Sequence, residues 1–122
     1  MNDITDSTPN QVTVTVARDS QGNIVITCTP DPVQVNAFNT LISFNLATAG
    51  YHFLATNTIV LDSPQPDFPY PAHTVNATLA TLLDLCTTSN SFKYTVYVVD
   101  TATGIQYSLD PVIKNGDATC QP

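Results

Sequence analysis

The sequence has little basic charge and no glutamate. Its 122 residues hold ten acidic side chains, all of them aspartate, against Arg18, Lys93 and Lys114, and the formal charge is −7. This balance excludes the clusters of basic residues that binding to nucleic acid or to an anionic membrane surface requires. Any carboxylate chemistry in this chain must therefore use aspartate.

Targeting and membrane signals are also missing. The N-terminal residues lack a basic region followed by an apolar region, and no uncharged apolar run reaches eighteen residues. Cys28, Cys86 and Cys120 are odd in number and have no metal-ligand spacing, so at least one stays unpaired within a monomer. These absences predict a soluble protein in a reducing compartment, the cytoplasm.

Motifs for familiar cofactor and nucleophile chemistry are absent. The chain has four glycines and contains no GxSxG elbow, phosphate-binding glycine loop or CxxC pair. His52 and His73 have no carboxylate three or four residues further along. We therefore expect no metal ion and no cofactor, and we expect both histidines to be ordinary strand or loop residues.

Hydrophobic periodicity predicts an all-β protein. Val12, Val14 and Val16 alternate with polar residues, which is typical of a half-buried strand. Residues 62–72 hold four prolines and are expected to form an irregular loop, whereas 73–86 fit a helix or a strand, with a strand favoured at 77–84. Other strands are predicted at 24–29, 41–47, 51–61, 92–100 and 105–113.

These elements are typical of an antiparallel, immunoglobulin-like β-sandwich of about six to eight strands. No internal repeat or change in composition divides the chain. We therefore predict a flexible N-terminus at 1–10 and a single β-sandwich domain at 11–122.

The last two predicted strands form a hairpin around residues 101–104. If Asp100 faces Ile105, opposed residues have numbers that sum to 205, and Thr95 lies opposite Asp110. Lys93 is then one diagonal step from Asp110, about 7–8 Å between α-carbons. One face of this hairpin carries Lys93, Thr95, Tyr97, Ser108, Asp110 and Val112, and the other face is largely apolar.

Two Asp-Pro dipeptides, Asp31-Pro32 and Asp110-Pro111, allow two interpretations. In the first, both end strands, because proline cannot donate a ladder hydrogen bond and aspartate favours turns. In the second, the aspartate carboxyl attacks its own carbonyl carbon and the proline nitrogen leaves. Intramolecular attack in a fixed geometry can reach effective molarities of about 10⁵–10⁸ M.

Several segments resemble one family. The pieces CTPDPVQV, FKYTVYVVD and SLDPVIKN are similar to the pattern of the DP-EP family of small bacterial β-sandwich proteins. The resemblance implies a self-cleaving aspartic peptidase that cuts Asp110-Pro111 and links Lys93 to the new terminal aspartate. Asp31-Pro32 departs from this pattern, because the family name implies Glu-Pro at that position.

The expected mechanism uses the chain as its own substrate. Asp110 attacks its own carbonyl or positions a water, the Pro111 nitrogen leaves, and Lys93 captures the acyl group or polarises the carbonyl. Burial between the sheets would lower the pKa of Lys93 and supply the neutral amine. Asp31 is the first choice for acid–base help, ahead of Asp84 or Asp100, while Thr95 and Tyr97 are candidate oxyanion donors.

Two alternatives remain open on sequence alone. Lys93 could be an exposed lysine that protects a sheet edge. The whole domain could also be a non-catalytic binding or structural module that contacts an unknown protein partner through Phe68 and Tyr70 of the proline-rich loop.

Overall fold

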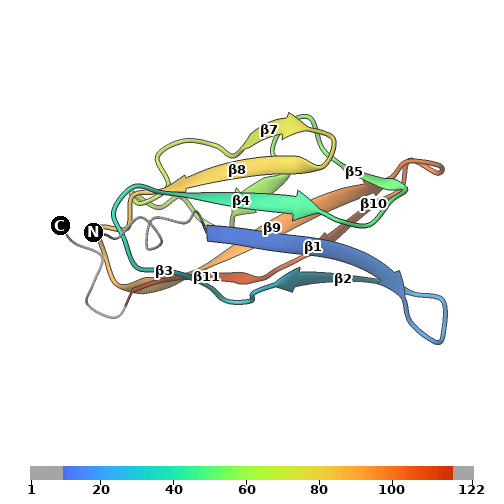
Figure 1. Cartoon of the computed structure of the whole chain (residues 1–122), viewed down its shortest axis with the longest axis horizontal. Helices are drawn as coiled ribbons and strands as arrows, with labels where there is room; N and C mark the ends of the chain where they lie inside the picture. Colours follow the sequence, from blue (N-terminus) through green and yellow to red (C-terminus); the bar gives the residue numbers. More distant parts are fainter. Residues whose placement is uncertain (1–9, 117–122) are drawn as a thin grey trace, which may run out of the picture.

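The computed structural model describes residues 10–116 and shows an all-β protein (Figure 1). Within these residues there are eleven strands and no helix. A five-stranded sheet has the order β2-β1-β4-β8-β7. Its strands are β1 (Asn10–Arg18), β2 (Ile24–Thr29), β4 (Thr40–Leu46), β7 (His73–Asn76) and β8 (Leu79–Asp84).

The second sheet has six strands and is built around the long strand β9. Strands β10 and β11 pair with β9, β3 pairs with β11, and β5 and β6 also pair with β9. The bounds are β3 (Val33–Val35), β5 (Tyr51–Phe53), β6 (Ile59–Leu61), β9 (Asn90–Asp100), β10 (Gln106–Leu109) and β11 (Val112–Asn115).

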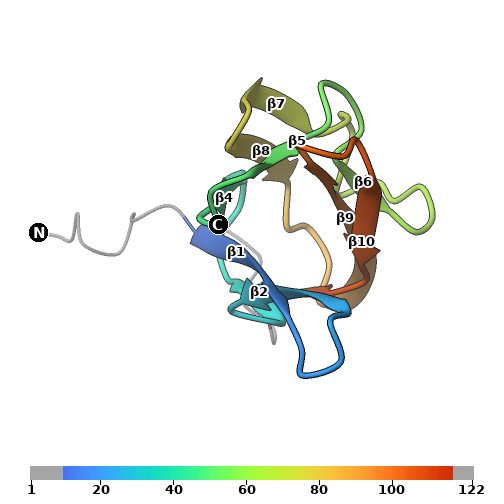
Figure 2. The ribbon, with the colours of Figure 1, turned by 90° about the vertical axis from the view of Figure 1, so that its right-hand side faces the viewer.

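The two sheets face each other, with β1, β4 and β8 on one side of the molecule and β9 and β10 on the other (Figure 2). A single cluster of buried hydrophobic side chains forms the core. Alternate residues of β1 and β9 point inward, because successive side chains of a strand face opposite sides of the sheet. Phe44 of β4 meets Tyr94 of β9 edge to face, with ring centroids 5.6 Å apart. This aromatic contact joins the sheets near the middle of the core.

The structure confirms the all-β class and the two-layer architecture but corrects two details of the prediction. Each sheet is mixed rather than antiparallel, because β1 runs parallel to β4 and β3 runs parallel to β11. There are more strands than the predicted six to eight. The predicted strand at 51–61 is two strands, β5 and β6, and neither β3 nor β7 was predicted.

Other predicted elements agree with the structure. The strand favoured at 77–84 is present as β8, and the strand at 24–29 has the predicted bounds. Residues 62–72 contain no strand. The predicted flexible segment 1–10 lies outside the described residues except for Asn10, which begins β1.

The last hairpin has the predicted register. Opposed residues of β9 and β10, and of β9 and β11, have numbers that sum to 205 in both ladders. Gly104 closes the turn at φ +75°, a conformation that glycine adopts without strain, and donates its N–H to the Asp100 carbonyl at 2.7 Å. The outward and inward faces of β9 also alternate as predicted.

The cysteines differ in state. Cys28 is buried and free, whereas Cys86 is disulfide-bonded. Such bonds persist mainly in oxidising compartments, so this one does not favour the predicted reducing environment. Among residues 10–116, the structure has no helix that is long and apolar enough to cross a membrane.

Candidate functional site

The second arm of the hairpin is broken at Asp110-Pro111, between β10 and β11. Proline has no N–H to donate to β9, which explains the interruption. The pairing register nevertheless continues, because the Tyr94 N–H donates to the Pro111 carbonyl at 3.0 Å. The structure therefore keeps the Asp110-Pro111 bond beside β9 although it belongs to neither strand. Asp110 is exposed, and Pro111 is buried.

Side chains on the outer face of this sheet form two rows across β9. In the first row, Lys93 lies between Val112 of β11 and Asp62, whose N–H donates to the Lys93 carbonyl at 3.0 Å. In the second row, Thr95 lies between Val60 of β6 and Asp110. Opposed residues share a face, so Asp62, Lys93, Thr95 and Asp110 all lie on this exterior face.

The Thr95 hydroxyl lies between two carboxylates. It is 2.8 Å from Asp110 Oδ1 and 3.2 Å from Asp62 Oδ1. A hydroxyl has one hydrogen to donate, so it can serve only one of these acceptors at a time. The sequence predicted Thr95 as an oxyanion donor, and in the structure its hydroxyl lies within hydrogen-bond distance of the Asp110 carboxylate, the nearer one, and of the Asp62 carboxylate. The hydroxyl therefore orients Asp110.

Asp31 reaches the same site from the segment between β2 and β3. The Val112 N–H donates to Asp31 Oδ1 at 3.0 Å, and the parallel pairing of β3 with β11 explains this approach. Residues 31 and 112 are 81 positions apart in sequence, yet the fold brings the two Asp-Pro dipeptides together. Of the three carboxylates considered as helpers from sequence, Asp31 is the one that lies at Asp110-Pro111.

The other two helpers lie elsewhere. Asp100 is at the hairpin turn, where its Oδ1 accepts the Ala102 N–H at 2.9 Å. Asp84 is completely buried and accepts the Cys86 N–H at 2.9 Å. Tyr97 lies opposite Ser108, one row beyond Thr95, so it is on the predicted face but not beside the reacting bond.

Lys93 lies on the exposed face of the sheet, so the burial on which the expected mechanism depends is not present. Its neighbours in β9, Phe92 and Tyr94, point into the core, and side chains alternate along a strand, so Lys93 points to the outer face. Burial therefore cannot provide the neutral amine that the expected mechanism needs.

A second polar cluster lies inside the protein. Asn115 is fully buried, and its Nδ2 donates to Asp67 Oδ2 at 2.9 Å and to Asp84 Oδ1 at 3.1 Å. Asp84 Oδ2 and Asn115 Oδ1 have no hydrogen-bond partner among the described residues. The backbone N–H and the hydroxyl of both Thr87 and Thr88 donate hydrogen bonds to the Asp67 carboxylate.

The two aspartates of this cluster have opposite pKa shifts. Burial raises the pKa of Asp84 to about 6, although hydrogen bonds from Asn115 and Cys86 oppose the change. Burial would also raise the pKa of Asp67, but the hydrogen bonds from Thr87 and Thr88 outweigh it and lower that pKa below its ordinary value. Asp84 is therefore a buried acid that titrates close to neutrality.

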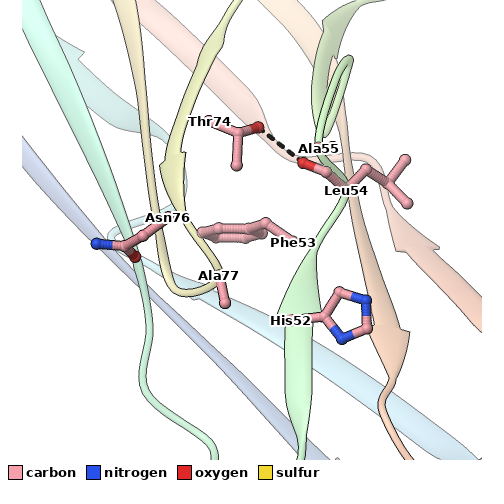
Figure 3. A pocket seen from close by; sticks show the side chains of 7 residues that line it. All are labelled: His52, Phe53, Leu54, Ala55, Thr74, Asn76 and Ala77. Atoms are coloured by element: carbon pink, nitrogen blue, oxygen red, sulfur yellow. Dashed lines mark hydrogen bonds between the residues drawn. The ribbon is translucent and has the colours of Figure 1, made fainter.

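The cavity around His52 does not overlap the candidate site. It has a volume of about 450 Å³ and lies between β5 and β7, where the Thr74 hydroxyl donates to the Leu54 carbonyl (Figure 3). His52 Nδ1 is 2.9 Å from the Thr101 hydroxyl, and His73 is an exposed residue of β7. No group of three or more potential metal ligands occurs within residues 10–116.

Comparison with known proteins gives no functional assignment. No family model matches the chain, and no curated protein matches it.

The sequence did not point to Asp62. The single strand predicted at 51–61 gives no reason to place this residue beside Lys93. In the structure, β5 and β6 pair with β9 in different registers, with numbers that sum to 151 and to 155. This four-residue shift, caused by the segment at 54–58, puts Asp62 opposite Lys93. In the sequence, only the length of that irregular segment determines which residue lies opposite Lys93.

Proposed function

We propose that this protein cleaves its own Asp110-Pro111 bond and transfers the Asp110 acyl group to Lys93. The contact between Thr95 and Asp110, at 2.8 Å, carries the proposal. It fixes a carboxylate on the face that also bears Lys93, next to a peptide bond that the strands leave unpaired. Holding the reacting group in place is the condition under which intramolecular attack becomes fast.

The reaction begins at the carboxylate of Asp110. One of its oxygens attacks the main-chain carbonyl carbon of the same residue and closes a five-membered cyclic anhydride. The bond to the Pro111 nitrogen breaks, and that nitrogen takes up a proton as it leaves. Asp31 is well placed to assist, because its carboxylate holds the N–H of Val112, the residue that follows Pro111.

The anhydride can then react in two ways. Attack by the Lys93 amine on the side-chain carbonyl gives an amide between Lys93 and Asp110 and leaves the α-carboxylate free. Attack by water gives two free carboxyl groups instead. The first outcome exchanges one amide for another, and the second consumes one water.

The cleaved tail would stay in place after the reaction. Pro111 and Ile113 are buried, and Ile113 belongs to β11, which pairs with both β9 and β3. Burial of an aliphatic side chain contributes about 1.5–3 kcal/mol. A cut protein would therefore keep one folded domain until it is denatured.

Intact mass spectrometry of denatured, reduced protein tests the proposal. Reductant is needed because Cys120 belongs to the tail, and a disulfide would keep the fragments together. The proposal expects fragments 1–110 and 111–122 whose masses sum to that of the parent chain. A sum larger by one water would indicate hydrolysis without transfer, and a chain that stays intact would refute self-cleavage.

Tryptic mapping locates the new bond. Transfer protects Lys93 from trypsin and gives a peptide 19–110 that is one water lighter than the same linear stretch. Lys93→Arg is the matched variant, since it keeps the positive charge but should abolish this peptide. Incubation of folded and urea-unfolded samples provides the control for acid lability of Asp-Pro bonds. Equal cleavage in both states, or at Asp31-Pro32, would remove the catalytic role of the fold.

The proposal includes the finer fold type and the compartment. We assign the sandwich to the immunoglobulin-like type, on the basis of its two packed sheets and its final hairpin. The cytoplasm remains the compartment predicted from sequence, and the disulfide at Cys86 weighs against it. A free Cys86 thiol in cells that are lysed in the presence of a thiol-blocking reagent would support the cytoplasmic assignment.

One observation supports the alternative of a non-catalytic binding module. Tyr70 of the proline-rich loop is 64% exposed, and Val60 beside the same shallow hollow is 37% exposed. Aromatic side chains presented in this way are common in protein interfaces. Phe68, the other residue considered for this surface, instead packs into the core against Phe92. An intact chain in the mass measurement would favour this alternative.

A further inference from the structure

Transfer to Lys93 requires a base, and the candidate residues from sequence do not provide one. An ammonium group cannot attack a carbonyl, so Lys93 must lose a proton before it reacts. Lys93 is exposed, and burial does not remove that proton. Asp110 is consumed as the acyl donor, and Asp31 Oδ1 accepts the Val112 N–H.

Asp62 lies directly opposite Lys93 on the same outer face. The Asp62 N–H donates to the Lys93 carbonyl at 3.0 Å, and both residues line one polar hollow of about 180 Å³. Side chains that oppose each other across antiparallel strands have β-carbons about 4.5–5.5 Å apart. The Asp62 carboxylate is thus within the range of the flexible lysine side chain.

Asp62 is also connected to the acyl donor. Its Oδ1 lies 3.2 Å from the Thr95 hydroxyl, which is 2.8 Å from Asp110 Oδ1. The hydroxyl can donate to Asp62 once Asp110 has lost its negative charge in the anhydride. Asp62 therefore lies opposite Lys93 and contacts the same Thr95 hydroxyl as Asp110.

We propose that Asp62 is the base that accepts the proton of Lys93 and so directs the reaction to transfer rather than hydrolysis. This inference rests on the proposed self-cleavage.

The protons and bonds of this step balance. The Lys93 ammonium gives one proton to Asp62, the neutral amine attacks the side-chain carbonyl of the anhydride, and the nitrogen then loses its second proton. The carbon–oxygen bond of the anhydride breaks and releases the α-carboxylate of Asp110. The departing Pro111 nitrogen gains two protons in total, so the positive charge lost at Lys93 appears at the new N-terminus.

The Asp62→Asn variant tests the inference through the ratio of products. We expect cleavage to continue, while the fraction of chains with the Lys93–Asp110 amide falls by about tenfold or more. The missing base should be replaced by hydroxide, so the amide fraction of the variant should rise with pH. Its pH profile should be steeper than that of the parent protein, a change that a purely structural role would not produce.

Two further variants complete the test. Asp62→Glu keeps a carboxylate and should restore part of the amide fraction, which also guards against a folding defect in the asparagine variant. Asp19→Asn removes an acid from the exposed first turn and should leave the product ratio unchanged.

The outcomes separate this inference from the proposed function. A parent protein that is cut and crosslinked, with an Asp62→Asn variant of equal amide fraction and pH profile, would overturn the role of Asp62 alone. A parent protein that is cut but never crosslinked would overturn the transfer step and this role with it. A parent protein that is never cut would overturn both proposals.

Discussion

The buried acid Asp84 should make the folded state less stable as pH rises. Its pKa is raised from 3.8 to about 6, chiefly by burial. A raised pKa means that the folded state holds the proton more tightly than the unfolded state. The stabilisation is therefore complete below pH 3.8 and is lost as pH rises through about 6.

The magnitude follows from the size of the shift. A difference of one pKa unit corresponds to about 1.36 kcal/mol, so Asp84 should contribute about 3 kcal/mol to the free energy of unfolding at low pH relative to pH 8. Asp67 does not interfere in this range. Its pKa is lowered, so its own contribution is lost only as pH falls below its ordinary value.

Asp84→Asn isolates this effect. The amide has nearly the same shape as the acid, keeps an oxygen that can accept the Asn115 Nδ2 hydrogen bond, and carries no charge at any pH. We expect the variant to match the parent protein near pH 4 and to be more stable by about 3 kcal/mol near pH 8. Urea denaturation of both proteins, with the disulfide intact and the same covalent state confirmed by mass, measures the difference.

The two curves can also refute the reasoning. A difference in unfolding free energy that stays constant between about pH 4 and about pH 8 would mean that Asp84 does not titrate in this range. A variant that is less stable than the parent protein near about pH 8 would show that the ionised carboxylate of Asp84 stabilises the fold as the acceptor for Cys86 and Asn115.

Two other substitutions test the site and the core. Thr95→Val removes the hydroxyl that contacts Asp110, so single-turnover cleavage should slow by about tenfold. The free energy of unfolding, measured with urea, should change by less than about 1 kcal/mol because Thr95 is half-buried. An unchanged cleavage rate would contradict the orienting role. Phe44→Ala leaves a cavity at a fully buried position and removes the edge-to-face contact with Tyr94, so the free energy of unfolding should fall by about 3–5 kcal/mol. A decrease below about 1 kcal/mol would contradict the assigned packing.

The sequence was most informative where pattern and turn chemistry agree. In the last hairpin, alternation set the two faces of β9, and Gly104 supplied the positive φ that closes the turn. Together these fix the register, because a slip of one residue would turn every buried side chain outward. The positions of Lys93, Thr95 and Asp110 relative to one another were predictable for the same reason.

Features that depend on long-range pairing were not predictable. Strand β3 has three residues, too few to show alternation, and it exists because β11 provides a parallel partner. The approach of Asp31 to Val112 follows from that pairing. The exposed position of Lys93, by contrast, follows from the alternation in the sequence, which puts this residue on the polar face of the hairpin.

The environments of the two Asp-Pro dipeptides explain why they should behave differently. Both lie at the junction of β3, β9 and β11, yet the carboxylate of Asp31 already accepts a backbone N–H from Val112. An acceptor held in this way is less free to attack its own carbonyl. The carboxylate of Asp110 has only the Thr95 hydroxyl as its partner among the described residues, and it faces the side that bears Lys93. If the proposed self-cleavage occurs, we therefore expect Asp31 to have a supporting role and Asp110 to be the reactive group, although their local sequences are the same dipeptide.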